Sequence, residues 1–295
     1  MIMNQLALIK TVRERTGGGM IDVKKALEAS DWDVEKAITW LKSNGKIKAA
    51  KKAGRVSAEG LVSIAQKDNK AVMLEVNSET DFVAQNEDFK KLVQRFTTIL
   101  LNSNAASLEE FMQTKDGNET VETILEDATA TIGEKLSIRR FEVFTASEGE
   151  KIGAFAHVNG QIAALVKVKG SNDEVARNVA MHLAAMKPEF IFVEEVPTER
   201  IETFKAEFVK PAGFENKPEK IQTAILEGSL NKKLAEVVLV KQGFMMEESV
   251  SIEKYLANHG LELLKAIRYG VGEGIEKQQD DFAAEVAAQI QKASQ

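Results

Sequence analysis

The sequence predicts an α+β protein built around a duplicated core, in which a β-hairpin is followed by a helix. Two segments of alternating apolar residues, each containing a tight turn, recur in the middle of the chain. An amphipathic helical pattern follows each of them. Helical patterns also occur outside these segments: three short ones come first, and a helical hairpin and a C-terminal helix come later. Helices laid over one face of a hairpin sheet are typical of α+β folds.

We expect five parts along the chain, each with its own pattern. They are a three-helix N-terminal domain at 1–45, a basic linker at 46–56, a first repeat at 57–145, a second repeat at 146–270 that contains an antiparallel helical hairpin at about 197–235, and a C-terminal helical module at 271–295.

The composition excludes several classes of protein. The chain has 295 residues, 44% of them hydrophobic and 28% charged, as in an ordinary globular protein. It has no cysteine, so disulfides, thiol catalysis and thiolate metal sites are excluded. No apolar run approaches the roughly 18 residues of a membrane span, and nothing before Asn4 resembles a targeting peptide. We therefore expect a cytoplasmic protein with no membrane partner.

The N-terminal domain is predicted from one clear helical stripe and one turn. Val34, Ala37 and Leu41 fall on one helix face, and Asp33 stands at the N-cap position. Glycines at 17–19 end the first helix and permit a tight reversal. No strand precedes this turn and no Gly-Lys-Ser/Thr follows it, so it is not a phosphate-binding loop. A three-helix unit of this size resembles a ubiquitin-associated domain.

The basic linker has three open interpretations. Residues 1–55 contain 12 Lys and Arg against 6 Asp and Glu, although the whole chain has a net charge of −6. The segment could be a solvated tether, a contact for an acidic partner surface or a nucleic-acid site. No aromatic residue is interleaved to stack on bases and the rest of the chain repels phosphate, so we expect no nucleic-acid partner. The cations concerned are Lys42, Lys46, Lys48, Lys51, Lys52 and Arg55.

The two copies of the core differ in one connector. In the first copy, strands at 60–65 and 71–76 precede a helix at 87–101. In the second, strands at 153–157 and 162–168, with an Asn159-Gly160 hairpin turn, precede a helix at 173–186. About ten residues join strand to helix in the first copy and about four in the second. The extra residues are where an unusual apolar pair lies.

That pair, Phe82 and Val83, has two interpretations. Connectors are usually polar, and Asn86 is the expected N-cap of the helix that follows. Phe82 could cover the edge of the core as a lid. It could also project outward as an anchor for a partner, since binding residues concentrate on loops held by a rigid scaffold. The short connector of the second copy shows that the core does not need the extra length, which favours the outward interpretation.

The remaining segments complete the predicted fold. A helix is expected within 107–133 and a strand within 136–144. Ile201, Phe204 and Phe208 form one stripe of the helical hairpin, and a further strand is expected at 261–269. Phe282, Val286 and Ile290 form a thin stripe on a helix at 276–292, which makes that helix a candidate partner contact.

No catalytic or metal-binding constellation is found. His157, His182 and His259 are far apart and belong to no metal-ligand motif. His182 is expected to be a satisfied, half-buried imidazole, and His157 is expected to lie exposed at a hairpin tip. Asp81 could serve as a general base, but no nucleophile or paired acid accompanies it. We therefore expect no metal, no cofactor and no covalent catalysis.

Three stretches carry a resemblance to a known family. Glu-Val-Asn-Ser-Glu-Thr-Asp-Phe-Val at 75–83 resembles the signature of the elongation factor Ts family. The stretch at 13–20, with Lys24 and Lys25 after it, is similar to the start of that family, and the two stretches 271–277 and 281–287 are similar to its end. Gln85 departs from the family pattern, in which a basic residue is more usual.

The resemblance implies a guanine-nucleotide exchange factor in protein synthesis, whose partner is elongation factor Tu in its GDP-bound and nucleotide-free forms. It implies that Phe82 acts as a wedge between two helices of the partner and dislocates its Mg²⁺. It further implies that the N-terminal domain and the C-terminal helix grip the partner and that the second repeat faces its β-barrel. The implied contact residues are Thr80, Asp81, Phe82 and Val83 at the wedge, Arg13, Met20, Ile21 and Lys24 in the N-terminal domain, and His157 in the second repeat.

Two other functions compete with this one. The three-helix unit by itself would suit a ubiquitin-binding adaptor, although that function leaves the 75–83 stretch unexplained. A hydrolase that uses Asp81 and a histidine is the alternative from the enzyme class.

Overall fold

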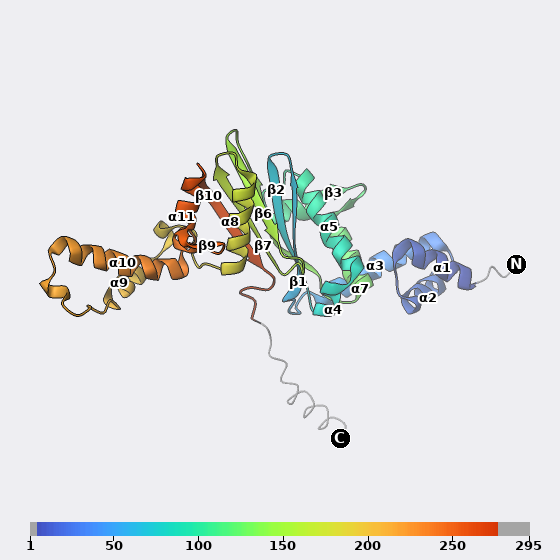
Figure 1. Ribbon diagram of the computed structural model, residues 1–295. Coiled ribbons are helices and arrows are strands. Elements are labelled where there is room, and N and C mark those ends of the chain that lie inside the picture. Colours follow the sequence, from blue (N-terminus) through green and yellow to red (C-terminus); the bar gives the residue numbers. More distant parts are fainter. Residues whose placement is uncertain (1–4, 277–295) are drawn as a thin grey trace, which may run out of the picture.

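The computed structural model describes residues 5–276 and has a long shape with three parts (Figure 1). Three N-terminal helices form one end, a central body contains two three-stranded sheets, and a pair of helices projects at the other end. The fold is α+β, as the sequence predicts. The C-terminal helix predicted at 276–292 lies almost entirely outside the described residues, as does its apolar stripe.

The N-terminal helices pack around a small apolar core of their own. They are α1 (Gln5–Thr16), α2 (Met20–Ala29) and α3 (Val34–Lys52). The Asp33 side chain caps α3 by accepting a hydrogen bond from the Lys36 N–H at 2.9 Å. The residues buried in this core are Ile9, Val12, Val23, Ala26, Leu27 and Ala37.

The predicted basic linker is not a separate segment. Helix α3 runs without a break to Lys52, through the boundary expected near residue 45. Its second half packs along α7 (Val121–Ile132), where Gly45 lies so close to Ala130 that a Cβ would be 3.1 Å from the alanine side chain. Lys42 forms an ion pair of 2.6 Å with Glu119. The tether interpretation is wrong for the predicted linker, because Lys52 donates a hydrogen bond to the Gly133 carbonyl and Arg55 forms an ion pair of 3.2 Å with Glu79, both in the core.

The first repeat forms an antiparallel sheet in the order β1-β2-β5, with β1 (Glu59–Lys67), β2 (Lys70–Ser78) and β5 (Ser137–Thr145). Helix α5 (Glu87–Asn102) covers its outer face. Helix α6 (Leu108–Gln113), a small hairpin of β3 (Lys115–Asp116) and β4 (Glu119–Thr120), and α7 connect α5 to β5. The helix expected within 107–133 is thus two helices, because the β3–β4 hairpin interrupts it. The side chains buried beneath α5 include Phe89, Val93, Phe96 and Leu100.

The second repeat has the same topology, in the order β10-β7-β6. Its strands are β6 (Glu150–Ala156), β7 (Ile162–Lys169) and β10 (Glu262–Gly270), and α8 (Asp173–Met186) covers them. A Cβ on Gly153 would lie 2.2 Å from the backbone of Ala176, so only glycine allows α8 to approach β6 this closely. The strands expected at 136–144 and 261–269 are confirmed, and each pairs with the central strand of its own repeat.

The two sheets pack face to face and share an apolar layer between them. Helices therefore lie on the outside of both sheets, which gives four layers in the central body. The side chains buried between the sheets are Val62, Ala71, Met73, Phe144, Ala146, Ile152, Ala163, Leu165 and Tyr269.

The helical pair that projects from the second repeat consists of α9 (Thr198–Ala206) and α10 (Glu219–Val237). Phe204, Leu234 and Val237 are buried where the pair joins the body. Phe208 does not continue the α9 stripe, because the helix ends at Ala206; its ring packs against Phe214 at 5.5 Å instead. The short elements beside the pair are η1 (Val193–Glu195), η2 (Phe214–Asn216), η3 (Leu239–Lys241), β8 (Gly243–Phe244), β9 (Glu247–Ser251) and α11 (Ile252–Asn258).

Both ring nitrogens of His182 on α8 have partners, so the expected satisfied imidazole is confirmed, but the side chain is fully buried and not half-buried as predicted. Its Nδ1 accepts a hydrogen bond from the Met245 N–H at 3.2 Å, which leaves Nε2 to carry the proton and donate to Gln242 Oε1 at 3.1 Å. Burial lowers the pKa of His182 below its ordinary value of 6.5, although the hydrogen bond to Gln242 acts in the opposite direction.

We expect this histidine to destabilise the fold in acid. Because the folded pKa is lowered, the unfolded chain binds the proton first, and stability is lost as the pH falls below about 6.5. The expected slope is about 1 kcal/mol per pH unit in this range. Chemical denaturation between pH 5 and 8 measures it. The slope should be absent from His182→Gln and retained in the matched control His157→Gln; the same slope in His182→Gln would contradict this assignment.

Candidate functional site

The connector between β2 and α5 is a short helix rather than an irregular loop. Helix α4 (Asp81–Gln85) contains five residues, and the Thr80 hydroxyl caps it by accepting a hydrogen bond from the Val83 N–H at 3.4 Å. Thr80 is therefore the N-cap of α4. Asn86 caps the next helix by accepting from the Asp88 N–H at 2.7 Å, as the sequence predicts. Two caps in succession hold the chain in a sharp corner between α4 and α5.

Within α4 the apolar side chains point in different directions. Ala84 is only 4% exposed, and Val83 is half-buried against the core of the first sheet. Phe82 is 82% exposed. The lid interpretation of Phe82 is wrong, because its ring lies in water, while the two residues that follow it, Val83 and Ala84, anchor the helix. A large exposed aromatic residue on an anchored helix is the kind of residue that interfaces use as an anchor.

The polar residues around Phe82 have distinct roles. Asp81 and Gln85 are exposed at the two ends of α4. Thr80 is half-buried, and both its N–H and its hydroxyl donate hydrogen bonds to Glu134, at 2.9 and 2.6 Å. The side chain of Glu79 accepts a hydrogen bond from the Lys135 N–H at 2.5 Å. Sequence reasoning missed Glu134, since the residue lies 54 positions from Thr80 and no local pattern connects them.

The predicted N-terminal contact residues lie on neighbouring helices. Met20 and Ile21 begin α2 and are 57% and 71% exposed. Arg13 is exposed on α1, where its Nε donates to the Gly18 carbonyl at 3.3 Å, and Lys24 is exposed one turn after Met20. The structure therefore brings Arg13 and Met20 together at one hollow, and Ile21 and Lys24 are exposed beside Met20 on α2. Leu6, which is 70% exposed, was not predicted; it lines the same hollow as Arg13 and Met20.

His157 lies in the turn between β6 and β7 and is exposed, as predicted. Its Nδ1 is 2.7 Å from Asn159 Oδ1, so the ring is oriented by its own turn. The next residue, Val158, is 99% exposed and was not predicted. This turn contacts the beginning of β1, where the Val62 N–H donates to the Gly160 carbonyl at 2.7 Å. Since α4 also packs on β1, the second-repeat turn and the Phe82 helix flank the same strand.

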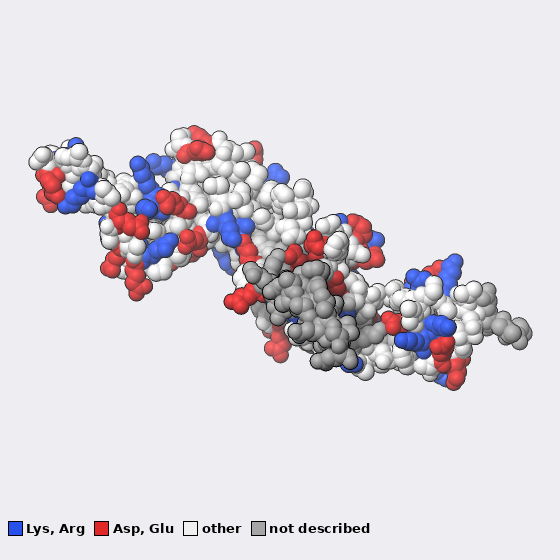
Figure 2. Space-filling model, turned by 90° about the horizontal axis from the view of Figure 1, so that it is seen from below, with Lys and Arg blue, Asp and Glu red and all other residues white. Residues whose placement is uncertain are grey.

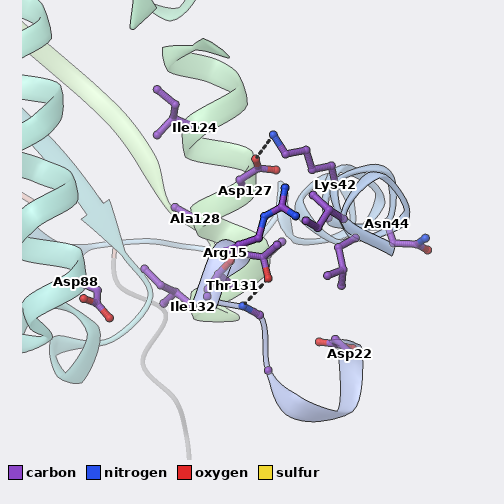
Figure 3. Close-up of a pocket in the computed structure, with 18 of the residues that line it drawn as sticks. Arg15, Asp22, Lys42, Asn44, Asp88, Ile124, Asp127, Ala128, Thr131 and Ile132 are labelled. Carbon is purple, nitrogen blue, oxygen red and sulfur yellow. Dashed lines mark hydrogen bonds and ion pairs between the residues drawn. The ribbon is translucent and has the colours of Figure 1, made fainter. Parts of the chain in front are cut away.

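A groove lies between the N-terminal helices and helices α5 and α7, beside the place where α3 packs on α7 (Figure 3). Arg15, Lys42 and Asp22 lie on its N-terminal side, and Asp88 and Asp127 lie on the side of the core. Both signs of charge face the groove, and Lys42 lies 4.0 Å from Asp127. The groove is thus lined by two parts of the fold, and its lining contains both acidic and basic side chains.

Two kinds of side-chain arrangement are relevant among the described residues: metal-ligand clusters and a pairing of Asp81 with a histidine. No group of three or more His, Asp or Glu residues in 5–276 could hold a metal ion. Within the same range, no hydrogen bond or ion pair joins Asp81 to a histidine: His157 pairs with Asn159, His182 with Gln242, and His259 with the Tyr255 carbonyl. None of the helices described for this chain is long and apolar enough to cross a membrane.

Charged side chains are interspersed on the surface. In the view of Figure 2, Lys and Arg are mixed with Asp and Glu on both the N-terminal helices and the projecting helical pair. Several basic residues of the N-terminal region form ion pairs, such as Arg15 with Glu35 at 2.5 Å. Among the described residues visible in this view, there is no continuous basic stripe of the kind that follows a nucleic-acid backbone.

Comparisons with known proteins identify the family. The family model described as Elongation factor TS matches residues 79–273. Elongation factor Ts of Mycoplasmopsis synoviae (strain 53) is 53% identical over 289 residues, covering 98% of this chain and 99% of the relative. Elongation factor Ts of Mycoplasmopsis pulmonis (strain UAB CTIP) is 54% identical over 288 residues, covering 97% of each chain. That of Acholeplasma laidlawii (strain PG-8A) is 43% identical over 291 residues, covering 97% of this chain and 98% of the relative. The chain belongs to the elongation factor Ts family and is a translation elongation factor.

Proposed function

We propose that this protein binds elongation factor Tu and promotes the release of GDP from it. The observation that carries this proposal is that the Phe82 side chain is 82% exposed on a capped helix. The two residues that follow it, Val83 and Ala84, anchor that helix in the core. An exposed aromatic ring held in place is ready to enter a pocket without a large loss of conformational freedom. Family membership supplies the partner.

The proposed activity requires no covalent step. An exchange factor binds the nucleotide-free GTPase more tightly than the GDP-bound one, and reciprocity of binding then requires it to weaken GDP binding by the same factor. The protein therefore acts as a binding partner that changes an affinity, and not as an enzyme that makes or breaks a bond. It needs no cofactor for this purpose.

In the proposed mechanism, the wedge consists of Thr80, Asp81, Phe82 and Val83. Phe82 enters between two helices of the GTPase domain near its switch region, and Asp81 meets polar groups beside them. The groups that hold the Mg²⁺ of elongation factor Tu are displaced. Without that ion the negative charges of the phosphates are no longer neutralised, so GDP is held less tightly.

Other surfaces extend the proposed interface. Arg13, Met20, Ile21 and Lys24 form an exposed apolar and basic patch that would grip a helix of the same GTPase domain. His157 and the exposed Val158 would meet the β-barrel part of elongation factor Tu. These contacts would hold the nucleotide-free state even after GDP has left. We place this activity in the cytoplasm, without nucleic acid or membrane partners.

The direct test is GDP release from purified elongation factor Tu loaded with a fluorescent GDP analogue. We expect substoichiometric amounts of this protein to accelerate release, because the factor is not consumed. Acceleration should diminish when EDTA removes Mg²⁺, since GDP is then already loosened. Release at the spontaneous rate in the presence of Mg²⁺ would contradict the proposed function. Ubiquitin binding and hydrolase assays on the same preparation separate it from the adaptor and the hydrolase.

A further inference from the structure

We propose that Glu134 is a positioning residue that holds Phe82 in its exposed, wedge-ready orientation. The inference rests on the proposed function, and it assigns a role to a residue outside the 75–83 stretch. Glu134 lies in the turn between α7 and β5, and its carboxylate contacts Thr80, the first residue of the wedge, in the connector after β2.

Both oxygens of the Glu134 carboxylate are used on the same residue. Oε2 accepts the Thr80 N–H at 2.9 Å, and Oε1 accepts the Thr80 hydroxyl at 2.6 Å. When one charged group accepts two hydrogen bonds from one residue, both the position and the orientation of that residue are defined. Because the Thr80 hydroxyl also caps α4, the carboxylate fixes the start of the helix that carries Phe82.

A second hydrogen bond joins the same two segments, with the side chain now supplied by the 79–80 segment. The Lys135 N–H donates to Glu79 Oε1 at 2.5 Å, so residues 79–80 and 134–135 each offer a side chain to the other segment. Arg55 also binds Glu79, at 3.2 Å. Reciprocal links of this kind prevent both sliding and rotation of the connector, since either movement would break at least one hydrogen bond to a charged group.

The turn that carries Glu134 is itself well held. Gly133 ends α7 in the left-handed conformation with φ 88°, and its N–H donates to the Thr129 carbonyl at 3.1 Å. Lys52 of α3 donates to the Gly133 carbonyl, and the Lys135 ammonium donates to the Arg55 carbonyl at 2.7 Å. The turn at 133–135, which holds Thr80 and Glu79, is thus connected to α7, β5 and the end of α3.

The position of Phe82 depends on how the two ends of α4 are held. A five-residue helix has no stability of its own, because helix formation has a costly nucleus. Its far end is held by the burial of Ala84, and its near end is held by Glu134. Without the near anchor, the first turn of α4 is free to move, and the Phe82 ring that it carries must then be reordered when the partner binds.

The test compares Glu134→Ala with Glu134→Gln and with the matched control Glu148→Ala. Glu148 is an exposed glutamate in the turn before β6. We expect Glu134→Ala to reduce GDP release at limiting factor about tenfold, the size of effect that follows when hydrogen bonds to a charged group are lost. Glu134→Gln should recover much of the activity, because its amide can accept one hydrogen bond and pair with the Thr80 hydroxyl. Glu148→Ala should behave as the unaltered protein.

A second readout does not depend on the partner. Amide hydrogen exchange of residues 83–86 in the free protein should become at least about tenfold faster in Glu134→Ala, whereas the melting temperature should change little. Faster amide exchange with reduced activity supports the positioning role. Unchanged amide exchange overturns it, whether or not activity falls. If the unaltered protein fails to release GDP, the proposed function is lost, and faster amide exchange in the variant still establishes that Glu134 positions the helix.

Discussion

Phe82→Ala is expected to slow GDP release from elongation factor Tu by about ten- to a hundred-fold at limiting factor. Burial of a phenylalanine in a partner pocket contributes about 1.5–3 kcal/mol, and alanine cannot supply it. The melting temperature of the free protein should hardly change, because the ring is already 82% exposed. Some activity should remain through the other proposed contact surfaces.

The measurement combines melting curves with release rates at several Mg²⁺ concentrations on one preparation. Phe96→Ala is the matched control, since Phe96 is fully buried on the inner face of α5, and this change should cost about 3–5 kcal/mol of stability. With EDTA present, Phe82→Ala and the unaltered protein should converge, because the ion that the wedge dislocates is already absent. A large fall in melting temperature for Phe82→Ala, with activity lost only in proportion to the fraction of unfolded protein, would contradict the wedge proposal.

Glu75→Ala is expected to produce the largest loss of stability among changes to charged residues. Glu75 is fully buried, and its two oxygens accept from Arg139 at 3.0 Å and from Arg140 at 2.6 Å. The Gly272 N–H also donates to it, at 2.8 Å. Removing one partner of a buried ion pair leaves the other charges without compensation. Because the two arginines are partly exposed, we expect a loss of about 3 kcal/mol, at the lower end of the usual range.

This cluster joins parts that are distant in sequence, so its loss should affect more than one of them. Arg139 donates to the Glu273 carbonyl as well, and Arg140 donates to the Gly270 carbonyl at 3.2 Å. Urea denaturation measures the stability, and hydrogen exchange at residues 270–276 shows whether the turn after β10 is released. The control is Glu253→Ala, which removes an exposed ion pair with Lys241 and should change stability by less than about 1 kcal/mol. An equally small change for Glu75→Ala would contradict the structural role of the cluster.

The site could be predicted from the sequence in part. The unusual connector was found because two copies of one pattern differ in length at that point, and length is a property of the sequence. Whether Phe82 was a lid or a projecting anchor could not be decided, since an apolar residue in a short connector has the same local pattern in both cases. Burial of Ala84 and exposure of Phe82 are results of how α4 packs on β1 and β2.

Glu134 shows the other limit of sequence reasoning. Its contact with Thr80 spans 54 residues and depends on the path of the chain through α5, α6 and α7. A glutamate after a helix is ordinary in sequence, because acidic residues are common in exposed turns. The contact exists only because β5 returns to pair with β2 and brings the turn before it beside the end of β2.

The sequence by itself determined the hairpins, most of the helices and the duplicated pattern of this protein. These features depend on apolar periodicity, caps and turn residues, which act over a few positions along the chain. The tertiary structure alone decided that α3 continues into the supposed linker, that Phe82 stands in water, and that Glu75 and Glu134 join distant segments. Each of these depends on which surfaces the packed sheets and helices leave free, and that is set by contacts between residues far apart in the chain.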